Sequence, residues 1–190
     1  MEKLNFQQVD WSLLPQPTDD GGSDHLAGST VPSTQLMSTD GNPVDIGSLT
    51  GWSVLYVYPL TGRPDMNLPN GWDDIPGTRG CTPQSCSFRD HYGDLRQHGV
   101  AGVFGVSTQS TEYQKEAAER MHLPFQLLSD DGLTLEKTLG LPTLIVDGRV
   151  LYKRITLILH GNKIEKVFYP IFPPDRNATD VLSYMKAINP

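Results

Sequence analysis

Both cysteines of this chain lie in the stretch Gly80-Cys81-Thr82-Pro83-Gln84-Ser85-Cys86, five residues apart. The stretch is predicted to begin a helix, because proline in the first turn gives up no helical hydrogen bond. A thiol at a helix N-terminus faces unpaired backbone N–H groups and the positive end of the helix dipole, and both favour the thiolate. Cys81 is therefore a candidate nucleophile.

The second cysteine has a geometric problem if it belongs to the same helix. Five residues of α-helix place the Cα atoms of Cys81 and Cys86 roughly 8 to 9 Å apart. A disulfide tolerates at most about 7 Å between Cα atoms. Joining the two cysteines would require the first helical turns to unwind, which would couple a redox event to a conformational change.

Outward from this stretch, the pattern alternates between strands and helices. A buried strand is predicted at residues 53–58, and the segment from Leu60 to Gly77 is predicted to be an unusually long loop. This alternation predicts an α/β fold with a mixed central β-sheet flanked by helices. The remaining predicted elements are a hairpin at 35–46, helices at 82–97, 111–121, 131–139 and 178–187, and sheet strands at 100–106, 123–128, 143–146, 150–152, 154–159 and 164–169.

Length and composition favour one domain preceded by an extension. The chain has 190 residues, 37% of them hydrophobic, which is enough for one substantial core. Its beginning carries Pro15, Pro17 and Asp19-Asp20-Gly21-Gly22, a composition that suits an extended arm. We expect an N-terminal extension at residues 1–30 and a domain at residues 31–190.

Charge and missing motifs narrow the function classes. A net charge of −7 without a Lys/Arg cluster argues against nucleic acid as a partner. No apolar stretch is long enough for a membrane span, and the N-terminus lacks the cationic and apolar runs of a signal peptide, so we expect a cytoplasmic protein. The five histidines are scattered and no phosphate-binding glycine motif occurs, so no metal and no cofactor are expected.

Several motifs occur in an order that resembles one known family. Tyr58-Pro59 ends a strand, Thr78-x-x-Cys81-Thr82 follows, and Phe88-Arg89-Asp90 continues the same helix. The sequence resembles the peroxiredoxins, and the Cys-x-x-x-x-Cys spacing resembles their Q subfamily, the bacterioferritin-comigratory proteins. The likeness covers roughly residues 30 to 187. Later motifs that agree are Gly105-Val106-Ser107, Leu123-Pro124-Phe125-x-Leu127-Leu128-Ser129-Asp130 and Arg154-x-Thr156-Leu157-Ile158.

The resemblance implies a thioredoxin-like fold of peroxiredoxin type and an antioxidant peroxidase activity. It implies that Cys81 is the peroxidatic nucleophile, that Cys86 is the resolving cysteine, that Thr78 hydrogen-bonds the peroxide and that Arg154 is the cation beside the thiolate. Hydrogen peroxide and organic hydroperoxides would oxidise Cys81 to a sulfenic acid, which condenses with Cys86 to a disulfide. Thioredoxin or a similar dithiol would reduce that disulfide, and the relatives include monomers and homodimers.

Two departures from the family pattern affect the expected site. The family usually has proline four residues before the motif threonine, but here that position is Asp74. Pro59, displaced by an insertion before the motif, and Pro76 are the candidates for its role. The residue after the threonine is Arg79, where the Q type commonly has proline, so a further cation is expected near Cys81.

Two other function classes stay open at this point. Gly140-Leu141-Pro142-Thr143 resembles the proline turn of thioredoxin-like disulfide oxidoreductases, although those proteins use Cys-x-x-Cys. A redox-responsive binding module that signals by unwinding of the cysteine helix is the non-enzyme alternative. Cys86 itself could pack in the core while an external thiol resolves Cys81.

Overall fold

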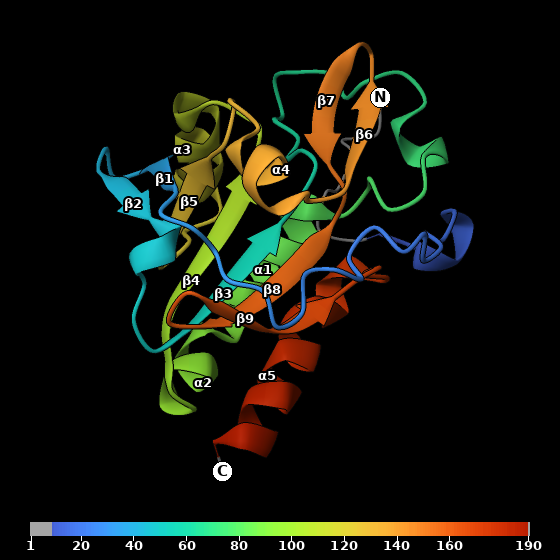
Figure 1. Ribbon diagram of the computed structural model, residues 1–190. Coiled ribbons are helices and arrows are strands. Elements are labelled where there is room, and N and C mark those ends of the chain that lie inside the picture. The colour runs from blue at the N-terminus through green and yellow to red at the C-terminus, as the bar shows by residue number, and fades with distance from the viewer. Residues whose placement is uncertain (1–8, 190) are drawn as a thin grey trace.

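The computed structural model describes residues 9–189 and has a mixed seven-stranded sheet at its centre (Figure 1). The strand order is β2-β1-β5-β4-β3-β8-β9. Strands β3, β4 and β5 run parallel, whereas β8 and β9 continue the sheet antiparallel. The strands are β1 (Gln35–Ser38), β2 (Pro43–Asp45), β3 (Trp52–Val57), β4 (Val100–Ser107), β5 (Gln126–Ser129), β8 (Ile155–His160) and β9 (Lys163–Phe168).

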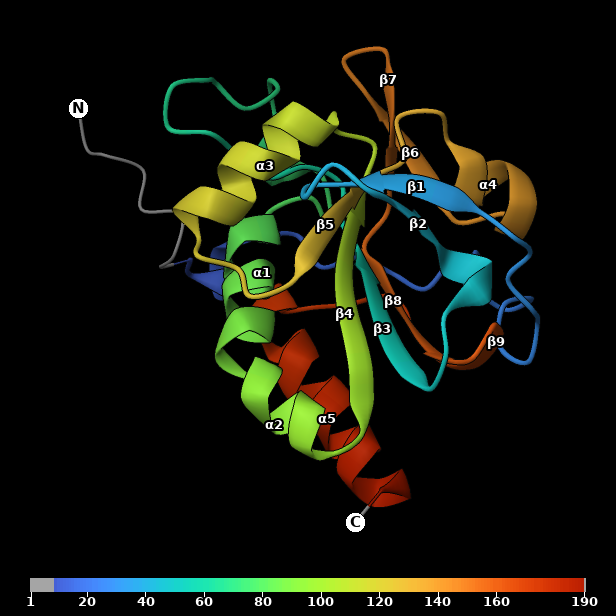
Figure 2. The same cartoon turned by 90° about the vertical axis from the view of Figure 1, so that its left-hand side faces the viewer.

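Helices cover the sheet, as the sequence predicted. Figure 2 shows α1, α2, α3 and α5 on one side of the sheet and α4 on the other. The α-helices are α1 (Cys81–Asp90), α2 (Tyr92–Gln97), α3 (Thr111–Arg120), α4 (Thr134–Leu139) and α5 (Asn177–Ile188). Short 3₁₀ helices are η1 (Trp11–Leu13), η2 (Ile46–Ser48), η3 (Trp72–Asp74) and η4 (Pro174–Arg176). The predicted mixed sheet flanked by helices is confirmed.

Strand β3 lies between two hydrophobic cores, which explains its nearly continuous apolar sequence. Val54 and Tyr56 pack in the core under α1 and α5, whereas Leu55 and Val57 pack in the core on the opposite face. All four side chains are at most 1% exposed. Because successive side chains of a strand point to opposite faces, a strand covered on both sides must be apolar throughout. β3 ends at Val57, and Pro59 and Leu60 begin the loop that leads towards α1.

Three predicted elements differ in the structure. The helix expected over residues 82–97 is divided at His91 into α1 and α2, and Leu95 of α2 is fully buried. The strand expected from residue 123 begins at Gln126, because Pro124 has no N–H and the Leu123 N–H donates to Ala118. The helix expected from residue 131 begins at Thr134.

The prediction that residues 143–152 extend the main sheet is wrong. They form a separate hairpin of β6 (Thr143–Val146) and β7 (Arg149–Tyr152), which projects from the sheet (Figure 1). Asp147 and Gly148 at its tip have φ angles of 49° and 72°. Positive φ at both central residues is typical of a two-residue hairpin turn whose twist matches that of the flanking strands. β6 and β7 therefore pair with each other and not with the main sheet.

The N-terminal segment lies against the domain over its described part, residues 9–31; residues 1–8 of the predicted extension lie outside the described residues. Leu26 and Val31 are each 1% exposed and belong to the core beneath α4. Thr30 bridges Lys163 of β9. The indole N–H of Trp11 donates to the Asp175 carboxylate at 2.9 Å. This segment, which we call the arm, therefore runs past the beginning of α1.

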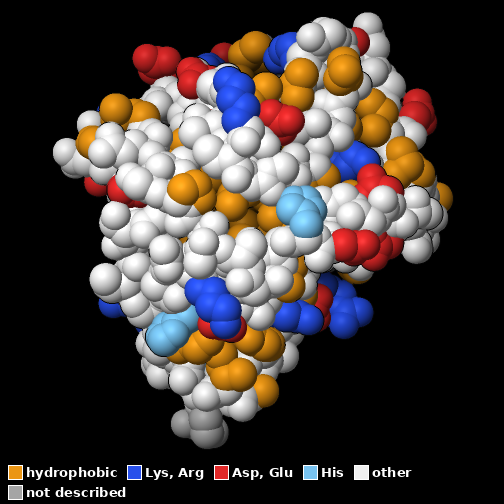
Figure 3. All heavy atoms as spheres, viewed as in Figure 1, with side chains coloured by type: hydrophobic (Ala, Val, Ile, Leu, Met, Phe, Trp, Pro, Cys, Tyr) orange, Lys and Arg blue, Asp and Glu red, His pale blue; other side chains and the backbone are white. Residues whose placement is uncertain are grey.

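Acidic and basic side chains are interspersed on the face seen in Figure 3. Among residues 9–189, no helix is long and apolar enough to cross a membrane.

Candidate active site

Cys81 is the first residue of α1, and its side chain is only 3% exposed. Gly80 before it has φ 106°, a conformation that side chains with Cβ rarely adopt. A Cβ at Gly80 would also lie 2.7 Å from the Trp11 ring and 2.8 Å from Pro174. Glycine is therefore required both for the backbone turn into α1 and for the close approach of the arm.

Arg154, in the connection between β7 and β8, reaches the sulfur of Cys81. Its Nη2 lies 3.2 Å from Sγ, and the side chain is 3% exposed. The same nitrogen donates to the carbonyl oxygens of Thr78 at 3.0 Å, Arg79 at 3.2 Å and Gly77 at 3.3 Å. These contacts join residues 77–79, just before Cys81, to the connection that leads into β8.

The charge of Arg154 is not neutralised by an acid. Within the described residues, no carboxylate forms an ion pair with this guanidinium. A buried charge without a counterion is costly, and an anion at Cys81 Sγ would remove that cost. Arg154 therefore places a buried positive charge beside Cys81 Sγ.

Arg154 is held by a series of hydrogen-bonded polar side chains that the sequence analysis did not predict. Arg154 Nη1 donates to the side-chain oxygen of Gln84, whose Nε2 donates to Asn177 Oδ1 at 3.0 Å. Thr156 Oγ1 donates to the same Asn177 oxygen at 2.7 Å. Gln84, Asn177 and Thr156 are each at most 1% exposed. The one signal in the sequence is that Gln84 lies three residues after Cys81 and hence on the same helix face.

Thr78 enters the site, but its hydroxyl does not contact the sulfur. The Thr78 carbonyl oxygen lies 3.5 Å from Cys81 Sγ. The hydroxyl donates towards two carbonyl oxygens of the preceding loop, those of Trp72 and, at 2.9 Å, Ile75. A hydroxyl has one proton and two acceptor lone pairs, so this oxygen can accept a hydrogen bond but has no second proton to donate.

Cys86 lies in the same helix, as predicted, and both cysteines are free. It is 9% exposed and packs in the core beneath α1. Burial raises the pKa of the Cys86 thiol, and the nearby Arg89 partly opposes that increase. Cys86 is therefore a thiol at neutral pH. Its helical spacing from Cys81 keeps the Cα atoms beyond the limit of about 7 Å for a disulfide.

The long loop from Leu60 to Gly77 covers the sulfur. Trp72 of η3 is 4% exposed and packs with Leu60 against Val146 and Leu151 of the β6–β7 hairpin. A narrow cavity above Cys81 is lined by Leu60, Gly62, Leu68, Trp72, Arg79, Gly80, Cys81, Thr82 and Pro83. The insertion thus restricts the approach to the sulfur from this side.

The two departures from the motif have structural outcomes. Asp74 lies in η3, whereas Pro59 and Pro76 both line a cavity that also contains Thr78 and Arg154. The side chain of Arg79 forms an ion pair with Asp73 at 3.1 Å. Arg79, the further cation expected near Cys81, therefore binds a residue of the insertion.

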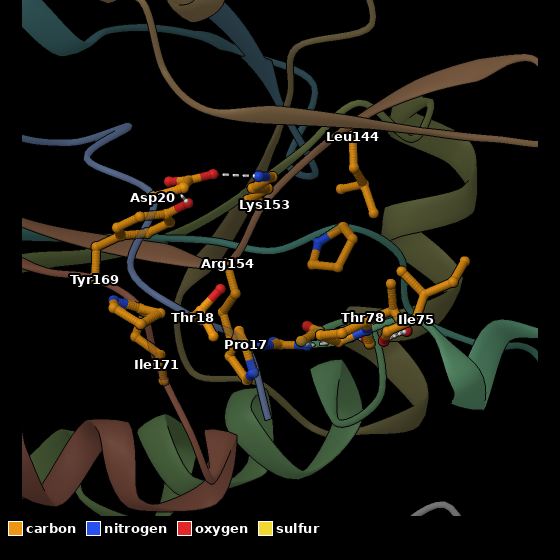
Figure 4. Close-up of a pocket in the computed structure, with 14 residues that line it drawn as sticks. Pro17, Thr18, Asp20, Ile75, Thr78, Leu144, Lys153, Arg154, Tyr169 and Ile171 are labelled. Carbon is orange, nitrogen blue, oxygen red and sulfur yellow. Dashed lines mark hydrogen bonds and ion pairs between the residues drawn. The ribbon is translucent and has the colours of Figure 1, made fainter. Parts of the chain in front are cut away.

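The cavity next to Arg154 has a volume of about 270 Å³ (Figure 4). Its floor contains Thr78 and Arg154, and its walls come from the arm, the loop after β9 and the end of the insertion. Figure 4 shows Asp20 of the arm joined to Lys153 and Tyr169 at the rim. The lining residues are Pro17, Thr18, Asp20, Pro59, Ile75, Pro76, Gly77, Thr78, Leu144, Lys153, Arg154, Tyr169, Pro170 and Ile171.

Comparison with solved structures supports the fold. The crystal structure of peroxidoxin BcpB from Mycobacterium tuberculosis matches with a TM-score of 0.70 and 25% identity, over 87% of this chain and 99% of that one. The structure of peroxiredoxin Q from Xanthomonas campestris matches with a TM-score of 0.64 and 18% identity, over 93% and 99% of the two chains. The thioredoxin-like peroxiredoxin fold expected from the sequence is confirmed.

Comparison by sequence identifies the family. The Redoxin family model matches residues 26–182. Chloroplastic peroxiredoxin Q from Sedum lineare is 32% identical over 163 residues, which cover 85% of this chain and 78% of that protein. The corresponding protein from Arabidopsis thaliana is 32% identical over 162 residues, 84% of this chain and 67% of that one. With two cysteines in one helix beside a buried arginine, the chain belongs to the redoxin family as a thiol peroxidase of the peroxiredoxin Q type.

Proposed function

We propose that Cys81 attacks the peroxide, that Cys86 resolves the resulting sulfenic acid as an intramolecular disulfide, and that a dithiol of the thioredoxin type restores both thiols. The observation that carries this proposal is the contact of 3.2 Å between Arg154 Nη2 and Cys81 Sγ. This buried cation has no carboxylate partner among residues 9–189, so its charge is available to stabilise the negative charge that develops during the reaction.

The first step is an in-line displacement at the O–O bond. The Cys81 thiolate attacks one peroxide oxygen, the O–O bond breaks, and the other oxygen leaves as an alkoxide or hydroxide that takes up a proton. Cys81 becomes a sulfenic acid while the peroxide is reduced to an alcohol or water. The Thr78 hydroxyl, with its proton held by the carbonyls of the preceding loop, would accept a hydrogen bond from the peroxide O–H.

The guanidinium of Arg154 offers a donor for the peroxide. Within the described residues, its buried Nε has no hydrogen-bond partner. In a planar guanidinium, Nε–H and one Nη2–H are parallel donors on one edge. Because Nη2 lies 3.2 Å from Cys81 Sγ, an acceptor on Nε would lie beside the sulfur. A bound peroxide oxygen in this position would satisfy the buried donor.

The second step, condensation of the Cys81 sulfenic acid with the Cys86 thiol, forms a disulfide and releases water. It requires the start of α1 to unwind, which breaks the hydrogen bond from Gln84 to Asn177 and the 3.1 Å bond from Tyr56 to Ser85. Phe88 stacks on Tyr56 at 4.5 Å between ring centroids and is fully buried. This contact limits the unwinding to the part of α1 before Phe88.

Oxidation is expected to remove amide protection from residues 84–87 and from the facing loop, residues 60–77. The physical reason is that a helix cannot bring Cys81 and Cys86 within bonding distance, so their disulfide must replace helical hydrogen bonds. Hydrogen exchange of the reduced and peroxide-treated protein measures this change. Peroxide-treated Cys86→Ser is the control and should keep its protection. The hypothesis would be falsified by a Cys81–Cys86 bond, seen by mass spectrometry, in a protein that keeps full protection across residues 84–87.

The disulfide-forming step should accelerate with pH. Burial raises the pKa of the Cys86 thiol, so below that pKa each unit of pH increases its thiolate fraction by about tenfold, and the thiolate is the attacking form. We expect the rate to rise steeply between pH 6 and 8. Rapid mixing with peroxide, followed by acid quenching and mass spectrometry, measures sulfenic acid and disulfide separately. A disulfide-forming rate that stays constant over this range would contradict attack by a Cys86 thiolate.

The direct test of the proposed cycle is peroxide-dependent oxidation of reduced thioredoxin by the wild-type protein. We expect thioredoxin to be consumed only when peroxide is present. Exchange with thioredoxin that needs no peroxide would indicate a disulfide oxidoreductase instead. Reaction only at millimolar peroxide, together with redox-dependent binding of another protein, would indicate a binding module.

The cycle requires no cofactor, because sulfur supplies both the nucleophile and the electrons. It suits a reducing compartment such as the cytoplasm, where thiols are kept reduced. We propose residues 31–190 as the catalytic domain and residues 1–30 as its extension. A monomer and a homodimer are both compatible with the proposed cycle, since both cysteines come from one chain.

A further inference from the structure

Trp11 of the arm is attached to the segment that leads into α5. Its indole N–H donates to the Asp175 carboxylate at 2.9 Å. Its ring lies edge to face against Phe172, with 6.1 Å between the ring centroids. A hydrogen bond to a charged group and an edge-to-face ring pair each stabilise the contact they make. The position of Trp11 is therefore fixed by two separate contacts with this segment.

The same indole lies on the backbone turn into α1. Gly80, the residue before Cys81, lies between the Trp11 ring and Pro174, since a Cβ at this glycine would be 2.7 Å from the ring and 2.8 Å from the proline. Packing this close leaves the Gly80 backbone no room to move. Because neighbouring Cα atoms are 3.8 Å apart, Cys81 cannot leave the first turn of α1 without displacing Gly80. Trp11 therefore restricts the movement of Cys81.

The arm also contacts the far end of the segment that precedes α1. A Cβ at Gly77 would lie 3.3 Å from Pro17 of the arm. Three residues further along, Asp20 forms an ion pair with Lys153 in the connection to β8. The arm is thus attached to the domain on both sides of residues 77–80, and it packs against the glycine at each end of this segment.

We propose that Trp11 is a positioning residue for Cys81: through Gly80 it keeps the start of α1 helical, and it must leave its place before Cys81 and Cys86 can form their disulfide. The inference rests on the proposed function. Contacts that are present in the helix and lost on unwinding slow the unwinding. The arm therefore slows the second step relative to the first and sets the lifetime of the Cys81 sulfenic acid. During that time a second peroxide can transfer an oxygen to the sulfur, which becomes a sulfinic acid while the peroxide leaves as water or an alcohol.

Trp11→Ala tests this role through the rate of disulfide formation divided by the rate of sulfenic acid formation. Rapid mixing with hydrogen peroxide, followed by acid quenching and mass spectrometry, gives both rates. We expect Trp11→Ala to raise the ratio at least fivefold, because unwinding no longer has to displace the indole. Trp11→Phe keeps an aromatic ring and should give a ratio between the two. Leu13→Ala is the matched control, since it shortens an 80% exposed side chain of the same 3₁₀ helix and should keep the wild-type ratio.

A second measurement follows the indole in the wild-type sequence and covers the case in which Trp11→Ala disturbs the arm. Labelling with 5-fluorotryptophan gives one ¹⁹F resonance for each of Trp11, Trp52 and Trp72, which single Trp→Phe replacements assign. Peroxide should shift the Trp11 resonance in the wild-type protein but not in Cys86→Ser. The resonance of Trp52, which stacks on His160 at 4.5 Å between ring centroids, should stay in place in both proteins.

Two results would overturn the role of Trp11 and leave the proposed cycle intact. One is a ratio in Trp11→Ala that equals the wild-type ratio or falls below it. The other is an unshifted Trp11 resonance in a protein whose Cys81–Cys86 disulfide is seen by mass spectrometry. A wild-type protein that forms no such disulfide with peroxide would instead overturn the proposed function, so the two failures are distinguishable.

Discussion

Cys81→Ser is expected to abolish peroxide reduction, whereas Cys86→Ser should still reduce one equivalent of peroxide and then stop. A serine hydroxyl at position 81 cannot form the sulfenic acid, and its much higher pKa leaves no anionic nucleophile beside Arg154. Cys86 lies one and a half turns further along α1 and does not contact the guanidinium, so its removal should spare the first step. Loss of the resolving thiol should lower steady-state turnover with thioredoxin to background.

Two assays separate these outcomes. A single-turnover assay counts the peroxide consumed per protein, and a steady-state assay follows oxidation of thioredoxin. Trapping with dimedone should label sulfenic acid at Cys81 in the Cys86→Ser variant. A Cys86→Ser protein that cycles with thioredoxin at the full rate would show that an external thiol resolves Cys81. Peroxide reduction by Cys81→Ser at the wild-type rate would remove the nucleophile from the proposal altogether.

Arg154→Met is expected to slow the reaction of Cys81 with peroxide by at least tenfold, and by up to about a hundredfold. Methionine fills part of the same volume but removes the charge 3.2 Å from Sγ and the free Nε donor. Arg154→Lys should give an intermediate rate, because lysine keeps the charge but lacks the two parallel donors of the guanidinium. The rate of sulfenic acid formation, measured by rapid mixing in the Cys86→Ser background, gives the comparison.

A control must separate catalysis from folding, because Arg154 also binds the carbonyl oxygens of Gly77, Thr78 and Arg79. Thermal unfolding of each variant reports any loss of stability. Arg149→Met is the matched control, since it removes an exposed arginine of β7 and should keep the wild-type rate. A folded Arg154→Met protein with the wild-type rate would show that this cation does not act in the step.

The structure brings three candidate residues of the sequence analysis together, and their positions depend on local motifs and on the family pattern. Cys81 begins a helix, Thr78 immediately precedes it, and Arg154 begins the segment that becomes β8. The alternation of strands and helices was likewise sufficient for the mixed sheet, since burial on both faces demands the apolar run of β3. The elements that were predicted wrongly are those whose ends depend on packing against another part of the chain. One example is the helix expected over residues 82–97, which is divided at His91.

The polar chain behind the site was not predictable from the sequence. Gln84 and Asn177 are 93 residues apart in the chain, and Arg154 and Gln84 are 70 residues apart. No local pattern distinguishes a glutamine that holds a buried arginine from one on a solvent-exposed helix face. The partner becomes visible only when α1, β8 and the start of α5 are packed together.

The sequence by itself determined the α/β fold, the family and a cysteine at a helix N-terminus, since periodicity, capping and motif order are properties of neighbouring residues. Only the tertiary structure decided that the insertion packs on the β6–β7 hairpin above Cys81 and that the arm walls a cavity beside Arg154. These features join segments such as Asp20 and Lys153 that are 133 residues apart. Their contacts depend on which surfaces the folded layers leave next to each other, and local conformational preferences carry no information about that.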